Sequence, residues 1–195
     1  MRMIKFFLAL FLLLKKTVIS FKKPQKKTVV IFDDVGSEFI IPLIKEYSYT
    51  IMPVRYHKIK KINLSLLVLG KMLNNIFKSS LKINYLAALI EIIDPKIVIT
   101  FIDNSNDYYY MTKLLNKKRN FLAIQNASRV PHLDNRLDDR ASKSIFHQKY
   151  AHFGNYEKKL YKKFHVQDFI KIGSLRQFYA WEYFKKKKIK TNKIK

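Results

Sequence analysis

A repeated unit of one short apolar run, one polar turn and one longer helical stretch constrains the fold of this chain more than any other feature. Apolar runs rich in Val and Ile stand at 28–32, 96–102 and 121–124. Because these runs are continuous rather than alternating, we expect strands that are buried on both faces. Strands joined through helices form parallel sheets by right-handed crossovers. The pattern therefore predicts an α/β fold, a three-layer sandwich around a mostly parallel sheet.

The expected elements cover most of the chain. Strands are expected at 28–32, 49–54, 96–102, 121–124, 150–153 and 169–172, and helices at 37–47, 64–77, 84–93, 108–117 and 155–164. Ser37 is positioned to cap the first of these helices, and Ser174 with Gln177 forms a capping box that opens a last one. Residues 127–148 lack periodicity and predict a long loop. The length of 195 residues fits one domain, which we place at 28–184.

The two ends of the chain are basic. Phe6–Leu14 is an unbroken apolar run between lysines, too short for the roughly 20 residues that cross a bilayer. The patch at 18–21 continues it, so we predict an apolar-basic helix at 1–27 that lies in a membrane interface. A terminal helix packed on the domain is the alternative. Residues 185–195 are rich in lysine and predict a solvated basic tail.

The charge and the cysteine content narrow the function classes. The net charge of +25 attracts polyanions such as nucleic acid, anionic lipid headgroups and phosphorylated substrates, although a codon bias toward lysine also contributes. The absence of cysteine excludes disulfides and thiolate metal sites, and fits a cytoplasmic protein. The histidines lack the spacing of a helical metal pair, so no metal site is expected. Neither a GxGxxG nor a Walker motif occurs.

Polar turns follow several of the expected strands. The turns after parallel strands lie along one edge of the sheet, where α/β folds bind ligands beside helix N-termini. The candidate residues in these turns are Asp33, Asp34 and Ser37; Asp103, Asn104 and Ser105; Gln125, Asn126 and Arg129; and Ser174 and Arg176. We therefore expect one polar site along this edge.

Four segments carry a family resemblance: VVIFDDVGSE (29–38), IVITFIDNSNDYYYMTKLL (97–115), FLAIQNASR (121–129) and HFGNYEKKLYKKF…FIKIGSLRQFY (152–179). They resemble bacterial surface carbohydrate biosynthesis proteins, whose fold is similar to GT-B glycosyltransferases and to polymerising glycerophosphotransferases of teichoic-acid synthesis. The resemblance covers about residues 28–180. It implies a Rossmann-like domain, the N-terminal half of a GT-B arrangement.

The resemblance also implies a missing donor-binding domain and a class of ligand. GT-B proteins pair two Rossmann-like domains and usually bind the activated donor in the second. We therefore expect an acceptor-side half without its donor-binding half, incomplete as an enzyme alone. A natural truncation, a split gene or a second chain that carries the rest would each account for this. The implied ligand is a polysaccharide or lipid-linked acceptor, with a nucleotide-activated sugar or alditol as co-substrate and no bound cofactor. The absence of cysteine and the apolar-basic N-terminal segment predict a cytoplasmic location, peripheral at the inner face of the cell membrane on anionic lipid.

Roles for the candidate residues follow from their chemistry and from the resemblance. Gln125-Asn126 aligns with a family turn that reads Gln-Asn-Gly, with Ala127 in the glycine position, and Gly173, Ser174 and Arg176 match the family's glycine-serine turn. Asp33 and Asp34 are candidate general bases toward an acceptor hydroxyl, or else helix-capping residues. Asp103 and Asn104 are candidates for holding sugar hydroxyls, or else turn-forming residues. Arg129 and Arg176 are candidates for binding a phosphate, or else face solvent.

Two other function classes remain open at this stage. The positive charge is compatible with a nucleic-acid-binding module, although no known nucleic-acid motif occurs and this partner is disfavoured. A nucleotide-binding Rossmann module without transferase activity is the second alternative. We expect the tyrosines and Trp181 to pack in the core and between helices rather than to stack on bases.

Overall fold

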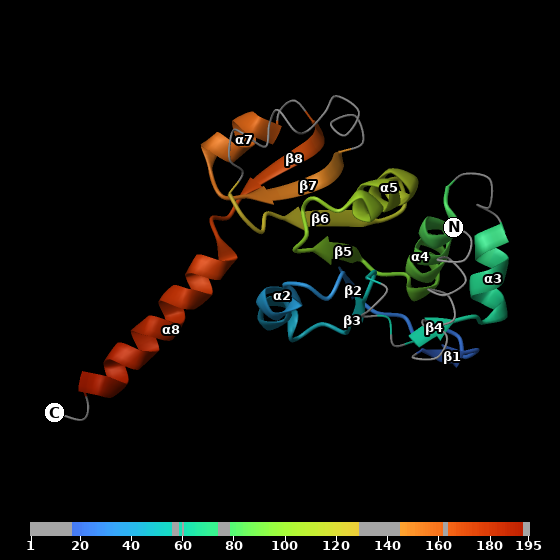
Figure 1. Ribbon diagram of the computed structural model, residues 1–195, viewed down its shortest axis with the longest axis horizontal. Coiled ribbons are helices and arrows are strands. Elements are labelled where there is room, and N and C mark those ends of the chain that lie inside the picture. The colour runs from blue at the N-terminus through green and yellow to red at the C-terminus, as the bar shows by residue number, and fades with distance from the viewer. Residues whose placement is uncertain are drawn as a thin grey trace, which may run out of the picture.

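The structure is a computed structural model that describes residues 17–55, 59, 61–73, 79–128, 145–161 and 164–192. Its strands are β1 (Val18–Ser20), β2 (Val29–Phe32), β3 (Tyr49–Met52), β4 (Lys61–Asn63), β5 (Ile97–Thr100), β6 (Asn120–Ile124), β7 (Phe146–His152) and β8 (His165–Lys171). Its helices are α2 (Ser37–Ile44), α3 (Leu66–Leu73), α4 (Leu81–Ile93), α5 (Asn106–Leu115), α7 (Asn155–Tyr161) and α8 (Leu175–Asn192). Figure 1 shows their arrangement.

The main sheet has six strands in the order β3-β2-β5-β6-β7-β8, and every neighbouring pair is parallel. The chain runs from β2 to β3, crosses back to β5 on the other side of β2, and then adds each strand outward. The connections therefore diverge between β2 and β5, which makes this pair the topological switch point of the sheet. The predicted α/β fold is confirmed as a Rossmann-like, three-layer arrangement.

Two apolar cores lie on opposite faces of the sheet, because successive side chains of a strand point to opposite sides. In β2, Val30 and Phe32 join the core beneath α4 and α5, whereas Val29 and Ile31 join the core beneath α2. All four residues are at most 3% exposed. Burial on both sides explains the continuous apolar runs in the sequence.

The helix predicted at 1–27 is wrong for residues 17–27, the part of this segment that the structure describes. Val18–Ser20 is not helical but forms strand β1, which pairs in parallel with β4 in a small second sheet. The bond from Leu64 N–H to the Ser20 carbonyl extends this pairing by one step. Residues 1–16 of the predicted interface helix lie outside the described residues.

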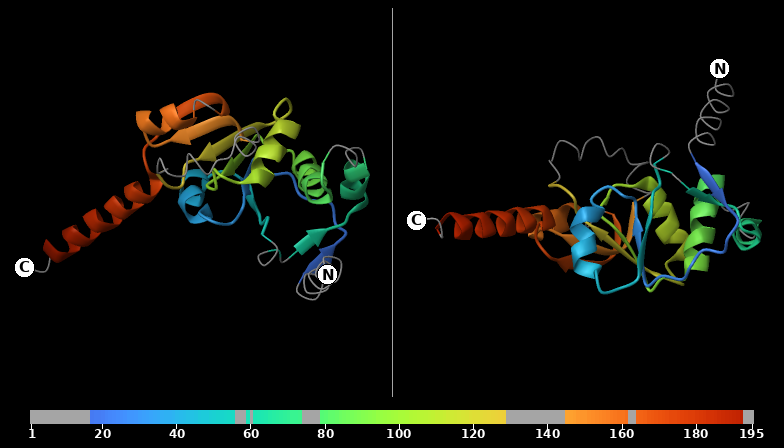
Figure 2. Two further views of the ribbon diagram at one scale, coloured as in Figure 1. Left: turned by 45° about the horizontal axis from the view of Figure 1, so that its top comes forward. Right: turned by 90° about the horizontal axis from the view of Figure 1, so that it is seen from below.

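The C-terminal prediction also needs correction, because the basic segment that begins at residue 185 continues helix α8 as far as Asn192. Helix α8 leaves the sheet and projects from one end of the molecule, while β1, β4 and α3 lie at the other end (Figures 1 and 2). Trp181 is 68% exposed, so the expectation that it packs in the core or between helices is wrong. Among the described residues, no helix has the length and apolar character needed to span a bilayer.

Two further differences concern the expected loop and the expected cap. Strand β7 begins at Phe146, inside the segment expected to form a loop. Its inward positions include His147, a fully buried polar residue, which hides the apolar pattern of a strand. At α2 the N-cap is Gly36 rather than Ser37, and no side chain caps this helix.

Candidate functional site

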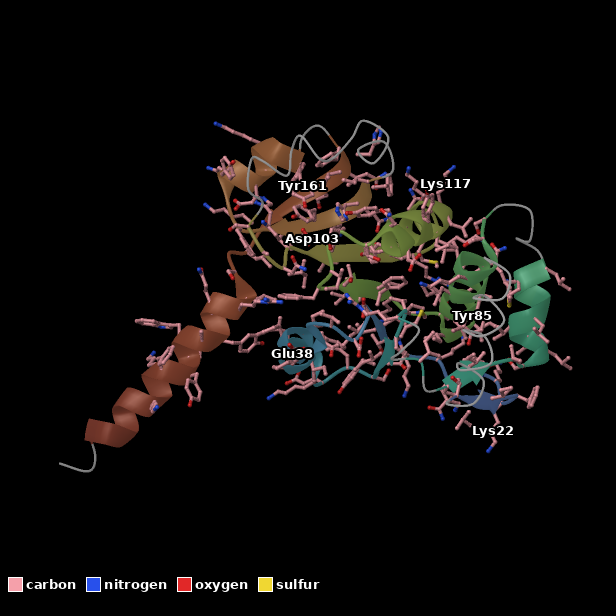
Figure 3. The ribbon with its side chains drawn as sticks, viewed as in Figure 1. Lys22, Glu38, Tyr85, Asp103, Lys117 and Tyr161 are labelled. Atoms are coloured by element: carbon pink, nitrogen blue, oxygen red, sulfur yellow. The ribbon has the colours of Figure 1, made fainter. Side chains whose placement is uncertain are left out.

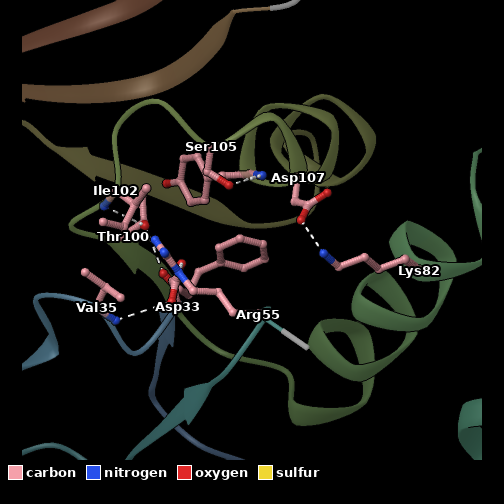
Figure 4. A network of polar contacts seen from close by, with 10 residues as sticks. Asp33, Val35, Arg55, Lys82, Thr100, Ile102, Ser105 and Asp107 are labelled. Carbon is pink, nitrogen blue, oxygen red and sulfur yellow. Dashed lines mark hydrogen bonds and ion pairs between the residues drawn. The ribbon is translucent and has the colours of Figure 1, made fainter. Parts of the chain in front are cut away.

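The carboxyl ends of the strands gather the polar turns predicted from the sequence. Because all six strands are parallel, the turns after β2, β5, β6 and β8 lie along one edge of the sheet. The turns that follow β2 and β5 flank the switch point, where folds of this kind leave room for a ligand. This part of the edge is the candidate site, and Figure 4 shows its polar contacts.

Asp33 and Arg55 form an ion pair in the candidate site. Asp33 follows β2, and its Oδ2 accepts a hydrogen bond from Arg55 Nε at 3.0 Å. Its Oδ1 accepts from the backbone N–H of Val35 at 3.3 Å. The Asp33 side chain is only 4% exposed, while that of Arg55 is 42% exposed. Asp33 is thus placed to hold the turn and the Arg55 guanidinium.

The turn between β2 and α2 has an unusual backbone. Asp33 has a φ of 75° and Gly36 a φ of 77°, in the left-handed region that glycine adopts most easily. A Cβ at Gly36 would lie 2.7 Å from Cγ and 2.9 Å from Cβ of Phe101, and closer still to its Cδ1. Only glycine therefore lets the first turn of α2 pack against the end of β5.

Arg176 reaches the same turn from the far end of the chain. It lies in the first turn of α8, and its guanidinium carbon is 5.4 Å from the ring centre of Phe101 and 5.5 Å from that of Phe39. The two rings stack at 5.1 Å, so the cation rests on an aromatic pair. Arg55 thus bonds to the β2–α2 turn, and Arg176 lies over the Phe101 ring that packs against this turn.

Thr100 joins the two strands at the switch point. Its hydroxyl donates to the Phe32 carbonyl at 2.8 Å and accepts from the Ile102 N–H at 3.1 Å. Lys82 of α4 and Asp107 of α5 form an ion pair of 2.6 Å beside the β5–α5 turn (Figure 4). These contacts fix the positions of the backbone that surrounds the site.

Asp103 is placed inside the protein rather than at the surface. It is fully buried, and its Oδ2 accepts hydrogen bonds from the hydroxyls of Tyr150 at 2.9 Å and Tyr161 at 3.1 Å. Its backbone carbonyl accepts from the Tyr109 hydroxyl at 2.7 Å. Figure 3 shows Asp103 and Tyr161 in this interior region. Asp103 therefore organises the packing of β7, α5 and α7, which leaves no room for sugar hydroxyls at its carboxylate.

Burial and the Asp103 charge act together on Tyr150. Burial raises the pKa of the Tyr150 hydroxyl above its ordinary value, and the neighbouring Asp103 carboxylate raises it further. The Tyr150 ring stacks on Tyr161 at 4.4 Å and on His147 at 4.9 Å. The hydroxyl thus stays protonated and donates to Asp103 across the whole ordinary pH range.

Asn104 and Ser105 complete the β5–α5 turn. Asn104 is exposed at the edge of the sheet, and its side chain is open to a ligand. Ser105 caps α5, because its hydroxyl accepts from the Tyr108 N–H at 3.3 Å. Of the three residues predicted in this turn, Asn104 is therefore the one best placed for contact with a ligand.

Gln125 links the ends of two strands. Its side-chain amide donates to the Ala127 carbonyl at 3.0 Å, and its Oε1 accepts from the Phe153 N–H at 2.9 Å. At 1% exposure, Gln125 has a structural position, and Asn126 beside it is half-buried. Ala127 is not among the described residues with positive φ, so alanine is unstrained in the position where the family turn has glycine.

The remaining predicted residues lie in the turn before α8, in the β2–α2 turn, or outside the described residues. The Ser174 hydroxyl accepts from the Gln177 N–H at 3.3 Å and caps α8, which is one half of the predicted capping box. Gly173 before it has a φ of 72°. Asp34 is half-buried, and its backbone carbonyl accepts from the Ser37 N–H at 3.2 Å. Arg129 lies outside the described residues.

Sequence reasoning missed Arg55, the residue that pairs with Asp33. Arg55 comes three positions after the end of β3, the neighbour of β2 in the sheet. The sequence could have indicated Arg55, because it directly follows the strand expected at 49–54 and so belongs to the same edge of the sheet as the other predicted turns. Phe101 and Thr100 were missed as well, since both read as ordinary residues of a buried strand.

The arrangement has the chemistry of an anion site. Two guanidinium groups from separate segments flank a turn at the switch point, and one of them is already paired with a carboxylate. Guanidinium groups bind phosphate and carboxylate oxygens through paired N–H donors. Among the described residues, no group of three histidine or acidic side chains is arranged to hold a metal ion. Comparison with protein-family models, with curated proteins and with solved structures finds no match to this chain.

Proposed function

We propose that this chain is a glycosyltransferase-like component of bacterial surface carbohydrate synthesis, the acceptor-side half of a GT-B arrangement. Its ligand in this proposal is a phosphorylated carbohydrate or alditol acceptor, bound at the carboxyl edge beside β2 and β5. A second chain or domain would supply the activated donor. The protein would work at the inner face of the cell membrane.

The observation that carries the proposal is the placement of Arg55 and Arg176 around the β2–α2 turn. Arg55 is 42% exposed and bonds to Asp33 through Nε. Arg176 is exposed and rests on the rings of Phe39 and Phe101. In this proposal a phosphate bound at the turn lies beside Arg55, and Arg176 approaches from the side of the Phe39 and Phe101 rings. The segments that resemble surface carbohydrate proteins contain the turns of this edge, which supports a phosphorylated carbohydrate as ligand.

Titration with glycerol 3-phosphate, the smallest phosphorylated alditol, tests the proposal. We expect shifts of backbone amide NMR signals at residues 33–36, 102–105 and 173–176. Arg176→Ala should weaken binding about tenfold or more, as expected for the loss of one charge-assisted phosphate contact. Lys96→Ala is the matched control, because Lys96 is exposed just before β5, at the opposite edge.

The outcomes separate the possible readings. Equal weakening by Arg176→Ala and Lys96→Ala would mean that the ligand responds to overall charge and not to the site. Amide shifts confined to other surfaces would reject the carboxyl edge. Binding of a free nucleotide but of no alditol or sugar phosphate would favour the nucleotide-binding alternative over a carbohydrate acceptor.

A further inference from the structure

Helix α3 presents an apolar face that no described residue covers. Leu66 is 87% exposed, Leu69 39% and Leu73 66%. With spacings of three and four residues, these leucines share one side of the helix. The opposite side packs on α4 through Val68, which is fully buried. A Cβ placed at Gly70, beside the leucines, would meet no atom within 4 Å.

Strand β1, which is joined to α3 through β4, also exposes apolar side chains. Val18 is 66% exposed and Phe21, just after the strand, is 73% exposed. Strand β1 pairs with β4, which runs directly into α3, so the three elements form one lobe at the end of the molecule (Figures 1 and 2). Isolated exposed apolar residues are ordinary on protein surfaces, whereas a cluster of this kind marks a contact surface.

The charges around the lobe are positive. Lys22 and Lys23 are exposed at the end of β1, and Lys61 is exposed in β4. Glu91, the acid that faces α3 from α4, already pairs with Lys71 at 3.4 Å and with Lys118 at 2.9 Å. The lobe therefore combines projecting leucines with lysines and a neutralised acid.

We propose that the α3 lobe, made of β1, β4 and α3, is the surface through which the protein contacts an anionic lipid bilayer. The leucines and Phe21 enter the boundary between headgroups and acyl chains, while the lysines contact the phosphates. In the sequence, β1 directly follows an apolar run at 6–14 and the pair Lys15-Lys16, which are residue types of the same kind. The inference depends on the proposed membrane location but not on the carbohydrate chemistry.

Other occupants fit this surface less well. A second copy of the chain would bring another net charge of +25 against a lysine-rich lobe, which opposes close pairing. Nucleic acid gains little from leucine side chains, because phosphates bind to cations and bases stack on aromatic rings. A lipid surface suits the side of α3 that Leu66, Leu69 and Leu73 share, and Leu67, 49% exposed, lies at the border of this side.

Vesicle co-sedimentation of the full chain tests the inference. We expect the protein to bind vesicles of phosphatidylcholine mixed with phosphatidylglycerol more tightly than vesicles of phosphatidylcholine alone. Leu66→Ser with Leu73→Ser should weaken binding at least about tenfold, since two leucines no longer enter the apolar layer. Leu43→Ser is the matched control, because Leu43 is 53% exposed on α2, away from the lobe. It should bind like the unaltered chain.

Each contrary result has a distinct meaning. Unaltered vesicle binding by the double variant would reject the α3 lobe and leave membrane attachment intact. No binding of the unaltered chain to either vesicle would reject membrane attachment itself, whereas binding of glycerol 3-phosphate tests the carbohydrate site separately. A double variant that changes the molar mass in light scattering would assign the leucines to a second copy. A Tm far below that expected from the helix propensity of two serines would show that residues of the same chain cover the leucines.

Discussion

Replacement of Gly36 by alanine tests the geometry of the candidate site most directly. Gly36 lies in the turn after β2, at a φ of 77°, with Phe101 against its Cα. Two separate effects oppose a side chain at this position. The left-handed backbone disfavours any residue with a Cβ, and the Phe101 ring occupies the space that the Cβ needs.

The magnitude of each effect follows from the structure. A left-handed backbone destabilises a non-glycine residue by about 1–2 kcal/mol. Phe101 is 1% exposed and stacks on Phe39, so it cannot move aside freely. Overpacking in a dense core adds about 1–3 kcal/mol. We therefore expect Gly36→Ala to lower the free energy of unfolding by about 2–5 kcal/mol.

Two other glycines provide matched controls for urea denaturation of the three variants. Gly173 has a φ of 72° but open space around its Cα, so Gly173→Ala should lower stability only by the backbone contribution of about 1–2 kcal/mol. Gly70 lies inside α3 with open space and no positive φ. Gly70→Ala should raise stability by about 0.5–1 kcal/mol, because alanine favours helix.

The comparison has a clear refuting result. Equal losses for Gly36→Ala and Gly173→Ala would show that Phe101 does not obstruct a side chain at Gly36. A second check is the pair Gly36→Ala with Phe101→Leu. If the ring is the obstacle, the two substitutions together should destabilise less than the sum of their separate effects.

Two further predictions concern the buried acid and the pH dependence of stability. Tyr161→Phe removes one of the two hydroxyls that donate to Asp103, so urea denaturation should show a loss of about 1–3 kcal/mol, while Tyr156→Phe, at a half-exposed position, should change little. Although burial acts to raise the pKa of Glu91, Lys118 and Lys71 lower it below its ordinary 4.5. The folded state then binds this proton less tightly than the unfolded state, so Glu91 stabilises above pH 4.5 and its contribution is lost as the pH falls through the folded pKa. The stability difference between the unaltered chain and Glu91→Gln should therefore shrink on acidification below pH 4.5, and a pH-independent difference would contradict this assignment.

The strands of the main sheet were predictable because their burial is simple. Apart from the terminal Thr100, every residue of Val29–Phe32 and Ile97–Thr100 is apolar, so side chains on both faces of the sheet are apolar. Such runs are typical of central parallel strands. The start of strand β7 was missed because its buried residues include His147, a polar side chain that stacks on Tyr150 of the same strand. The β1–β4 pair was not foreseen, since strands of three residues carry no periodic signal.

The candidate site was predictable in position but not in the role of each side chain. The parallel order places the predicted turns along one edge, as the alternating pattern requires. No sequence pattern distinguishes Asp103, which points inward to two tyrosines, from Asn104 beside it, which faces solvent. The pairing of Asp33 with Arg55 likewise depends on two strands that lie side by side, which sequence spacing alone does not specify.

Helix α8 starts at the edge containing Arg176 and projects away from the sheet (Figure 1). Its 18 residues extend about 27 Å at the rise of an α-helix. Any body fastened to the last turn of α8 is therefore kept at that distance from the carboxyl ends of the strands. Removal of one residue from the middle of the helix would draw such a body about 1.5 Å inward and rotate it by about 100°. Length and angular setting are thus coupled in this part of the chain, so an insertion or deletion would alter both together.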